Sequence, residues 1–242
     1  MSPVFALAAL IAVVAALVQR ITGLGFALVA TAPLVVLYGP LEGVRLVVLL
    51  GLVASGGMLL AVFGEVDWRR TGYIVAAGAL GSPLAAWVSV VAPGPVLLLI
   101  VGGAALLSLL VGRISPLVRF LTGVPGAVVA GGAAGFLHVT SGLSGPPLVA
   151  YSSGDRWEHR SFVASAQVIL LALHLLTLAW RGVPATPRRD VVVLAVLVAA
   201  GTVVGSLLSR RIPLRWARGA MFAIAWVGAV TVLVRGADAL MS

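Results

Sequence analysis

The amino-acid sequence predicts an all-α polytopic membrane protein built from two repeats, and three observations carry this prediction. Hydrophobic residues make up 61% of the 242 residues and charged residues only 10%, with a mean hydropathy of +1.17; a soluble domain carries about a quarter charged residues. Long apolar segments recur along the whole chain. Two short interruptions, rich in glycine and hydroxyl side chains, lie at matching places in the two halves.

The first half, residues 1–119, is expected to hold four long apolar segments and one short one. In order, these segments are 3–19, 26–38, 43–63, 72–91 and 95–112, followed by a linker at 113–122. Helix-breaking residues at Tyr38-Gly39-Pro40 and Ala92-Pro-Gly-Pro95 mark two of the boundaries. A charged stretch at 65–70 marks another.

The second half, residues 120–242, repeats this order. Its expected segments are 124–139, a very short piece that ends at Tyr151, then 161–180, 190–209 and 216–234. A polar loop at 155–160 follows the short piece. We expect one membrane domain made of these two transmembrane repeats.

The two short segments are expected to be half-helices or re-entrant segments. At 1.5 Å per residue they reach roughly 20 and 13 Å, against a hydrocarbon core of roughly 30 Å. The chain therefore has eight to ten membrane segments. If all ten cross, the repeats are inverted and the arginine distribution places both termini outside. If the short segments turn back, the arginines divide evenly and the orientation stays open.

The two interruptions predict a central site. The second runs from Thr140 to Pro147, and aligning it with the first puts Thr22 on Ser141 and Gly25 on Ser144. Irregular backbone at membrane depth is tolerated only where protein or a water-filled cavity satisfies its polar groups. Paired interruptions in two repeats are typical of the substrate site of a transporter.

The residues of the second interruption favour an anion site. A helix that starts after Ser144 has prolines suited to its first turn, serine hydroxyls available as caps and a positive dipole end. Such helix ends bind anions. Two of them facing each other would hold a small anion by N–H and O–H donors, without a buried arginine. The alternative is that glycines only permit close helix packing, which we expect for 131–135 and 201–205.

Few polar side chains lie within the expected spans. No Asp, Glu, Lys or Arg has to lie at mid-depth, which argues against a carboxylate proton relay. Thr31, Ser55 and Thr177 are expected to bond to carbonyls of their own helices.

Four larger polar side chains are candidates for the lining of a pathway, with a structural role as the equal alternative. Gln19 and His138 immediately precede the two breaks, and Gln167 and His174 lie seven residues apart on one helix face. The predicted substrate-binding residues are Gln19, Thr22, Gly23, Gly25, His138, Thr140, Ser141, Gly142, Ser144, Gly145, Gln167 and His174.

The amino-acid composition limits which partners the protein binds and which chemistry it carries out. The net charge of +9 would suggest nucleic acid in a soluble protein, but arginine in short loops between apolar segments sets membrane topology. We expect the lipid bilayer and a small anion as partners, and no nucleic acid. The absence of cysteine excludes thiolate sites. No metal or other cofactor is expected, and no enzyme motif is present.

Two motifs resemble those of the TauE/SafE family of bacterial membrane proteins. They are Ile21-Thr-Gly-Leu-Gly-Phe26 with Pro33-Leu34, and Ser141-Gly-Leu-Ser-Gly-Pro-Pro-Leu148 with Tyr151. Phe26-Ala27 stands where the family has further glycines. The resemblance covers essentially the whole chain. It implies a multi-pass protein of the bacterial cytoplasmic membrane that exports sulfite, organosulfonates or related sulfur-containing acids.

Three functions are therefore weighed. The leading one is a secondary transporter of small anions that works by alternating access around a midplane site. The alternative is a translocase of a lipid-linked anionic headgroup, which similar breaks would accommodate. A membrane enzyme that uses His138 or His174 has no supporting motif. The sequence leaves substrate identity, direction, coupling ion and oligomeric state open.

Overall fold

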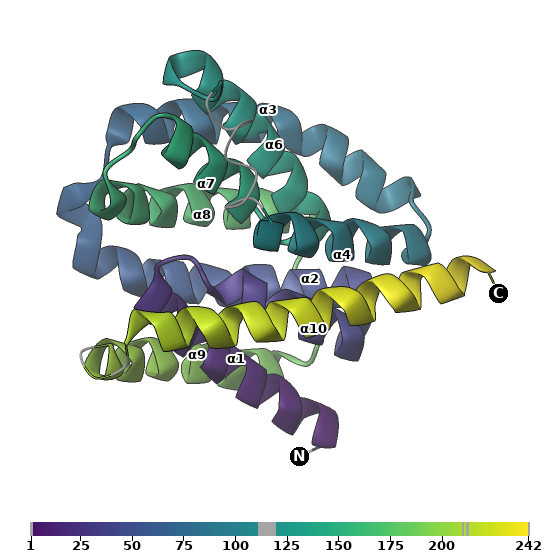
Figure 1. The fold of residues 1–242 in the computed structure, drawn as a ribbon. Coiled ribbons are helices and arrows are strands. Elements are labelled where there is room, and N and C mark those ends of the chain that lie inside the picture. The colour runs from purple at the N-terminus through teal and green to yellow at the C-terminus, as the bar shows by residue number, and fades with distance from the viewer. Residues whose placement is uncertain (1, 111–119, 210, 212, 242) are drawn as a thin grey trace.

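The computed structural model describes residues 2–110, 120–209, 211 and 213–241, and helices account for most of them (Figure 1). Seven of the described helices are long and apolar enough to cross a membrane. The expected linker at 113–122 and the boundary between the repeats lie mostly outside the described residues. The helices are α1 (Pro3–Thr22), α2 (Phe26–Val62), the 3-10 helix η1 (Phe63–Glu65), α3 (Trp68–Val91), α4 (Gly94–Leu110), α6 (Gly123–Ser141), α7 (Gly145–Gly154), α8 (His159–Arg181), α9 (Arg188–Leu208) and α10 (Leu214–Met241).

Acidic residues in the charged loops begin the next helices. The carboxylate of Asp67 accepts hydrogen bonds from the N–H groups of Arg69 and Arg70 at the start of α3. Glu158 does the same for the first amides of α8. A helix leaves its first N–H groups without intrahelical partners, and such caps satisfy them. The loop charges therefore fix where these two spans begin.

The chain doubles back inside α2, as the predicted short segment at 26–38 requires. Gly39 has φ 82° and ψ 168°, a conformation that side chains disfavour, and Pro40 starts the second part of the helix. A Cβ added at Gly43 would lie 2.6 Å from the Cα of Val35, so the two parts pack tightly against each other. Residues 26–38 thus form a half-helix, and residues 40–62 form a full-length helix.

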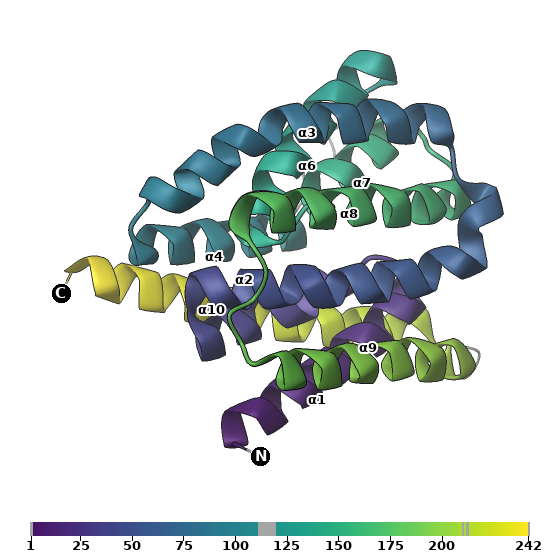
Figure 2. The same cartoon turned by 180° about the vertical axis from the view of Figure 1, so that it is seen from behind.

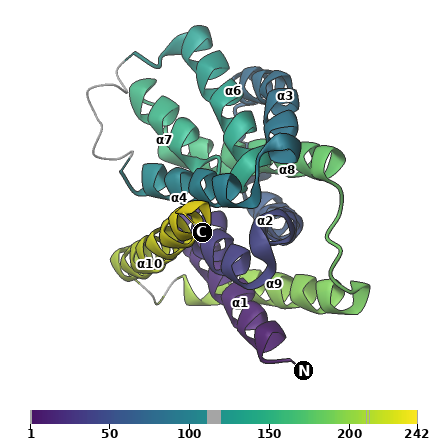
Figure 3. The same cartoon turned by 90° about the vertical axis from the view of Figure 1, so that its right-hand side faces the viewer.

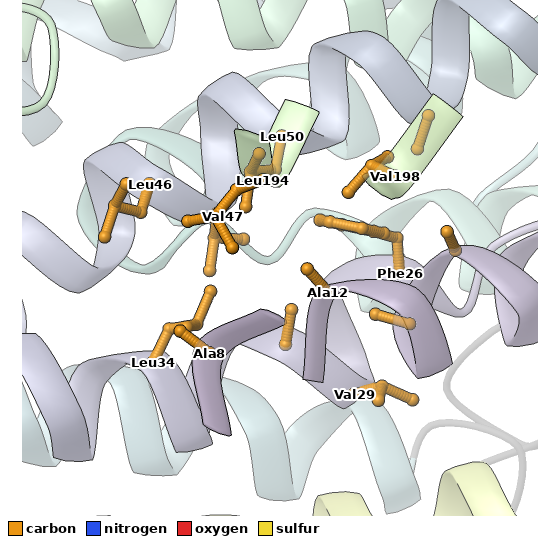
Figure 4. Close-up of a cluster of buried hydrophobic side chains, with 14 of the residues drawn as sticks. Ala8, Ala12, Phe26, Val29, Leu34, Leu46, Val47, Leu50, Leu194 and Val198 are labelled. Carbon is orange, nitrogen blue, oxygen red and sulfur yellow. The ribbon is translucent and has the colours of Figure 1, made fainter. Parts of the chain in front are cut away.

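Small apolar residues hold α1, α2 and α9 together (Figure 4). Ala8 and Ala12 of α1 lie among Phe26, Val29 and Leu34 of the half-helix, and all five side chains are buried. The second part of α2 and α9 complete this core with Leu46, Val47, Leu50, Leu194 and Val198. Alanine in α1 allows the half-helix to lie close beside it.

Glycine seams join other helix pairs, as the sequence predicts for 131–135 and 201–205. A Cβ added at Gly131 of α6 would lie 2.5 Å from the carbonyl oxygen of Ile74 in α3. A Cβ at Gly205 of α9 would lie 2.8 Å from the Cβ of Arg20 in α1. Both packing predictions are confirmed, because a Cβ at either glycine would overlap an atom of the neighbouring helix.

The second part of α2 lies in the interior of the bundle. Seen nearly end-on in Figure 3, α2 lies between α8 and α9, and it packs against both. Figure 2 shows α8 running alongside α2, with α3 on its far side. This arrangement brings the middle of α8 close to both chain breaks.

Candidate functional site

Each of the two breaks is a helix end closed by a glycine in the left-handed conformation. At the end of α1, Gly23 has φ 90°, and its N–H donates to the carbonyl of Gln19 at 2.7 Å. At the end of α6, Gly142 has φ 74°, and its N–H donates to the carbonyl of His138 at 2.8 Å. Glycine is favoured at both positions because a Cβ is strained at positive φ. Gly23 and Gly142, which the sequence alignment pairs, therefore play the same local role.

The two breaks meet at a small cavity of about 30 Å³. It lies between the start of α2 and the start of α7, and α1, α4 and α8 complete its walls. A Cβ added at Gly145 would meet no atom within 4 Å, so the backbone is open to this space. The lining residues are Gln19, Leu24, Phe26, Ala27, Leu28, Ser108, Leu143, Ser144, Gly145, Leu170 and His174.

Two glutamines connect the first break to α8. The amide Nε2 of Gln167 donates to the carbonyl of Gly23 at 2.9 Å and to that of Val163 at 3.0 Å. Its Oε1 accepts from Gln19 Nε2 at 3.3 Å, and Gln19 also donates to the hydroxyl of Ser55. These bonds leave the chain reversal at Gly23 fixed to the middle of α8.

Two histidines connect the second break to the same helix. His138 Nε2 and His174 Nδ1 are 2.9 Å apart, and His138 Nδ1 is 3.1 Å from the hydroxyl of Ser144. The imidazoles of His138 and His174 are buried. A chain of hydrogen bonds therefore runs from α8 to the first residues of α7. Of the residues that line the cavity, only His174 can take up a proton.

The two helix N-termini at the cavity differ in the amide donors that they offer. In α2 the first intrahelical hydrogen bond is donated by the N–H of Val29 to the carbonyl of Gly25, so the amides of Phe26, Ala27 and Leu28 precede it. In α7 the prolines that follow Gly145 have no N–H. The predicted serine cap is wrong: Ser144 makes no capping hydrogen bond, and its hydroxyl contacts His138 instead.

The comparisons with known proteins assign the chain to a family. The family described as Sulfite exporter TauE/SafE matches residues 8–232 of the 242. The chain belongs to the TauE/SafE family. No curated protein and no solved structure matches it. Together with the seven long apolar helices, membership makes this chain a multi-pass membrane protein of a transporter family.

Six of the site residues predicted from this sequence lie around the cavity, and the side chains of the others are engaged elsewhere. Gln19, Ser144, Gly145 and His174 line the cavity, and His138 and Gln167 contact its wall. The hydroxyls of Thr22, Thr140 and Ser141 donate to carbonyls of their own helices. Gly25 packs against Val18 and Met221. Gly23 and Gly142 shape the backbone of the breaks.

Three expectations for isolated hydroxyl groups have different outcomes. The hydroxyl of Thr177 donates to the carbonyl of Leu173, as expected. Ser55 is different, because its hydroxyl accepts from Gln19. Among the described residues, the buried Thr31 hydroxyl has no hydrogen-bond partner. The prediction of a bond within the helix is therefore wrong for Ser55 and Thr31.

Sequence reasoning missed two residues. Ser108 of α4 lines the cavity, although α4 carries no local signal that links it to the breaks. Arg181 ends α8 and is only 7% exposed, and its Nη1 donates to the carbonyls of Val139 and Thr140 at the end of α6. Arg181 does not line the cavity, so the expectation that the two helix ends hold an anion without a buried arginine stays a prediction. A spacing of seven from Gln167 to His174 to Arg181 was the available signal.

A second, wider cavity of about 320 Å³ lies where α3, α6 and α7 meet. At its edge Asp155 ties these helices together. Its carboxylate lies 2.7 Å from Arg70 Nη2 and accepts from the N–H of Gly123 and the hydroxyl of Tyr151. Partial burial opposes ionisation, but the Gly123 amide and the Arg70 guanidinium hold the pKa of Asp155 below its usual value. Within the described chain no group of three or more His, Asp or Glu residues is placed to hold a metal ion.

Proposed function

We propose that this TauE/SafE protein is a secondary transporter that exports a small sulfur oxyanion, such as sulfite or a sulfonate, through the cavity between its two breaks. The observation that carries the proposal is the meeting of two helix N-termini, one with free amides and one with Ser144, at one cavity. Amide donors in apolar surroundings bind anions strongly, because little water competes.

The size of the cavity supports a gated mechanism. A volume of about 30 Å³ holds one or two water molecules, so an anion of several atoms requires the walls to separate. Alternating access supplies that motion by moving one group of helices against another around a fixed site. The wall residues that would separate belong to α2 and α7, whose first turns face the same space.

The helix pairing supports two inverted repeats, 1–119 and 120–242. α3 packs against α6 while α1 packs against α9; α2 packs against α8, and α4 against α10. A two-fold relation between the halves exchanges α1 with α6 and α3 with α9, and it reproduces this set of contacts. The glycine-capped breaks at Gly23 and Gly142 fit the same relation. Inverted repeats of this kind are common in secondary transporters.

Flux into liposomes tests the site. Purified protein is reconstituted, and radiolabelled sulfite flux is measured for the wild type, Ser144→Leu and Ser153→Leu. Leucine at Ser144 fills the cavity, whereas the same change at exposed Ser153 alters the far end of the same helix. We expect saturable flux that only Ser144→Leu removes. Unchanged flux in Ser144→Leu would contradict the site.

The same liposomes test the alternative substrate. A translocase of lipid-linked headgroups would move a fluorescent polyprenyl phosphate between leaflets and would show no saturable sulfite flux. The small volume of the cavity favours the free anion, since a lipid headgroup needs an opening toward the bilayer. Headgroup movement without sulfite flux would replace the exporter proposal.

A further inference from the structure

Arg181 offers hydrogen-bond donors that the protein does not use. Its Nη1 is committed to the carbonyls of Val139 and Thr140, at 2.7 and 3.0 Å. Its Nε and Nη2 are buried and have no hydrogen-bond partner among the described residues. These two nitrogens form one edge of the planar guanidinium, the edge that matches two oxygens of an oxyanion. A buried, unpaired charged donor pair is expensive unless a ligand satisfies it.

No acidic side chain among the described residues forms an ion pair with the positive charge of Arg181. The four ion pairs within the described residues involve Arg45, Arg70 and Arg160, and Arg181 is in none of them. Arg45 lies close enough for its positive charge to act on Arg181. The Nε of Arg45 is also buried without a hydrogen-bond partner. Arg45 already has an acidic partner, because its Nη1 lies 3.8 Å from the carboxylate of Glu42. Arg181 is therefore the cation whose charge and donors are left for an anion.

Helix capping explains only one of the guanidinium nitrogens of Arg181. The carbonyls at the end of α6 have no intrahelical donors, and a cation at a helix C-terminus is stabilising. One nitrogen, Nη1, performs this role for Val139 and Thr140. A lysine ammonium would perform it equally well. The edge formed by Nε and Nη2 remains unexplained by capping.

The position of Arg181 connects it to the cavity. Gln167, His174 and Arg181 follow one another at intervals of seven residues on α8, so they share a face and lie about 10 Å apart along its axis. Gln167 contacts the first break, His174 lines the cavity, and Arg181 contacts the end of α6 beside the second break. An anion that leaves the cavity along this face would meet Arg181 next.

We propose that Arg181, with Arg45 beside it, forms a second binding site for a small oxyanion, at the end of α8 and separate from the cavity between the breaks. The site takes anions with two oxygens in one plane, the class to which sulfite, sulfonates and carboxylates belong. The proposal rests on the proposed function for the identity of the anion. The role of this second site is to hold the anion one step away from the central cavity.

Sulfite binding in a variant with a filled cavity tests this site alone. Sulfite that binds the folded protein raises the melting temperature. In Ser144→Leu, we expect sulfite still to stabilise the protein. Adding Arg181→Lys should raise the half-maximal sulfite concentration about tenfold, because lysine keeps the charge and the cap but loses the planar edge. Adding Arg189→Lys, the same change at an exposed arginine, should leave it unchanged.

Two results would overturn the second site. One is a Ser144→Leu protein that sulfite does not stabilise, and the other is an Arg181→Lys variant with unchanged sulfite dependence. If Arg181→Lys does not fold, Arg45→Gln in the same background decides: we expect weaker binding, and unchanged binding refutes the site. Failure of the proposed function is distinct, because it appears as missing flux in the wild type or unchanged flux in Ser144→Leu.

Discussion

Replacing Gly51 with alanine tests whether transport depends on the histidine pair. Gly51 lies in the second part of α2, and a Cβ added there would lie 2.6 Å from Cε1 and 2.7 Å from Nε2 of His174. Ordinary contact begins at 3.4 Å, so the imidazole has to move by about 0.8 Å, further than a well-packed interior accepts without strain.

The displacement acts on one hydrogen bond. His138 and His174 are joined at 2.9 Å, and a shift of about 0.8 Å along the bond would lengthen it to about 3.7 Å, beyond hydrogen-bonding distance. A buried polar group left unsatisfied costs about 1–3 kcal/mol, and about 1.4 kcal/mol corresponds to a factor of ten in rate. We therefore expect sulfite flux per folded protein to fall about ten- to a hundredfold.

Gly57 on the same helix supplies the matched control. A Cβ at Gly57 would meet Thr202 at 3.5 Å, an ordinary contact, so Gly57→Ala should keep wild-type flux. Flux in liposomes is compared at equal amounts of folded protein, with thermal unfolding measured in parallel. Wild-type flux in Gly51→Ala would show that the hydrogen bond between His138 and His174 is dispensable for transport.

Two further predictions concern the packing and charge that surround the site. Gly135→Val should lower the free energy of unfolding by about 1–3 kcal/mol, because its Cβ would overlap the α3 backbone. Gly132→Ala makes an ordinary contact at 3.9 Å and should leave the stability unchanged. Thermal unfolding measures both variants, and equal stability would contradict the close packing of α6 on α3. Asp155 stabilises the protein as an anion that Arg70 and Gly123 hold at a lowered pKa. Its contribution is complete above about pH 5, where an unfolded aspartate is ionised, and is lost as pH falls through the lowered pKa. The melting temperatures of wild type and Asp155→Asn should therefore differ near neutral pH and converge in acid, and a constant difference would contradict this.

Local sequence signals predicted the helix boundaries well. Glycine and proline restrict the backbone wherever they occur, so Gly23, Gly39 and Gly142 mark real chain reversals. Charged loop residues cannot lie at mid-membrane, and they therefore locate the ends of spans such as the start of α3 at Asp67. These effects depend on a few neighbouring residues and are visible without a structure.

Contacts between distant residues could not be predicted in the same way. Arg181 is buried because the carbonyls of Val139 and Thr140 come to it from another helix. Ser108 lines the cavity because α4 packs where it does. Gln167 and His174 were identified by their shared helix face, but their partners at Gly23 and His138 required the packing of α8 against both breaks.

The position of a bound anion shows whether the substrate lies between the two helix N-termini. Selenite has the shape and charge of sulfite and carries an anomalous scatterer, so a crystal grown with it locates the anion without assumption. We expect an anomalous peak in the cavity between the first turn of α2 and the start of α7, within hydrogen-bonding distance of the amides there. Saturable sulfite flux together with a selenite peak only elsewhere in the protein would contradict it.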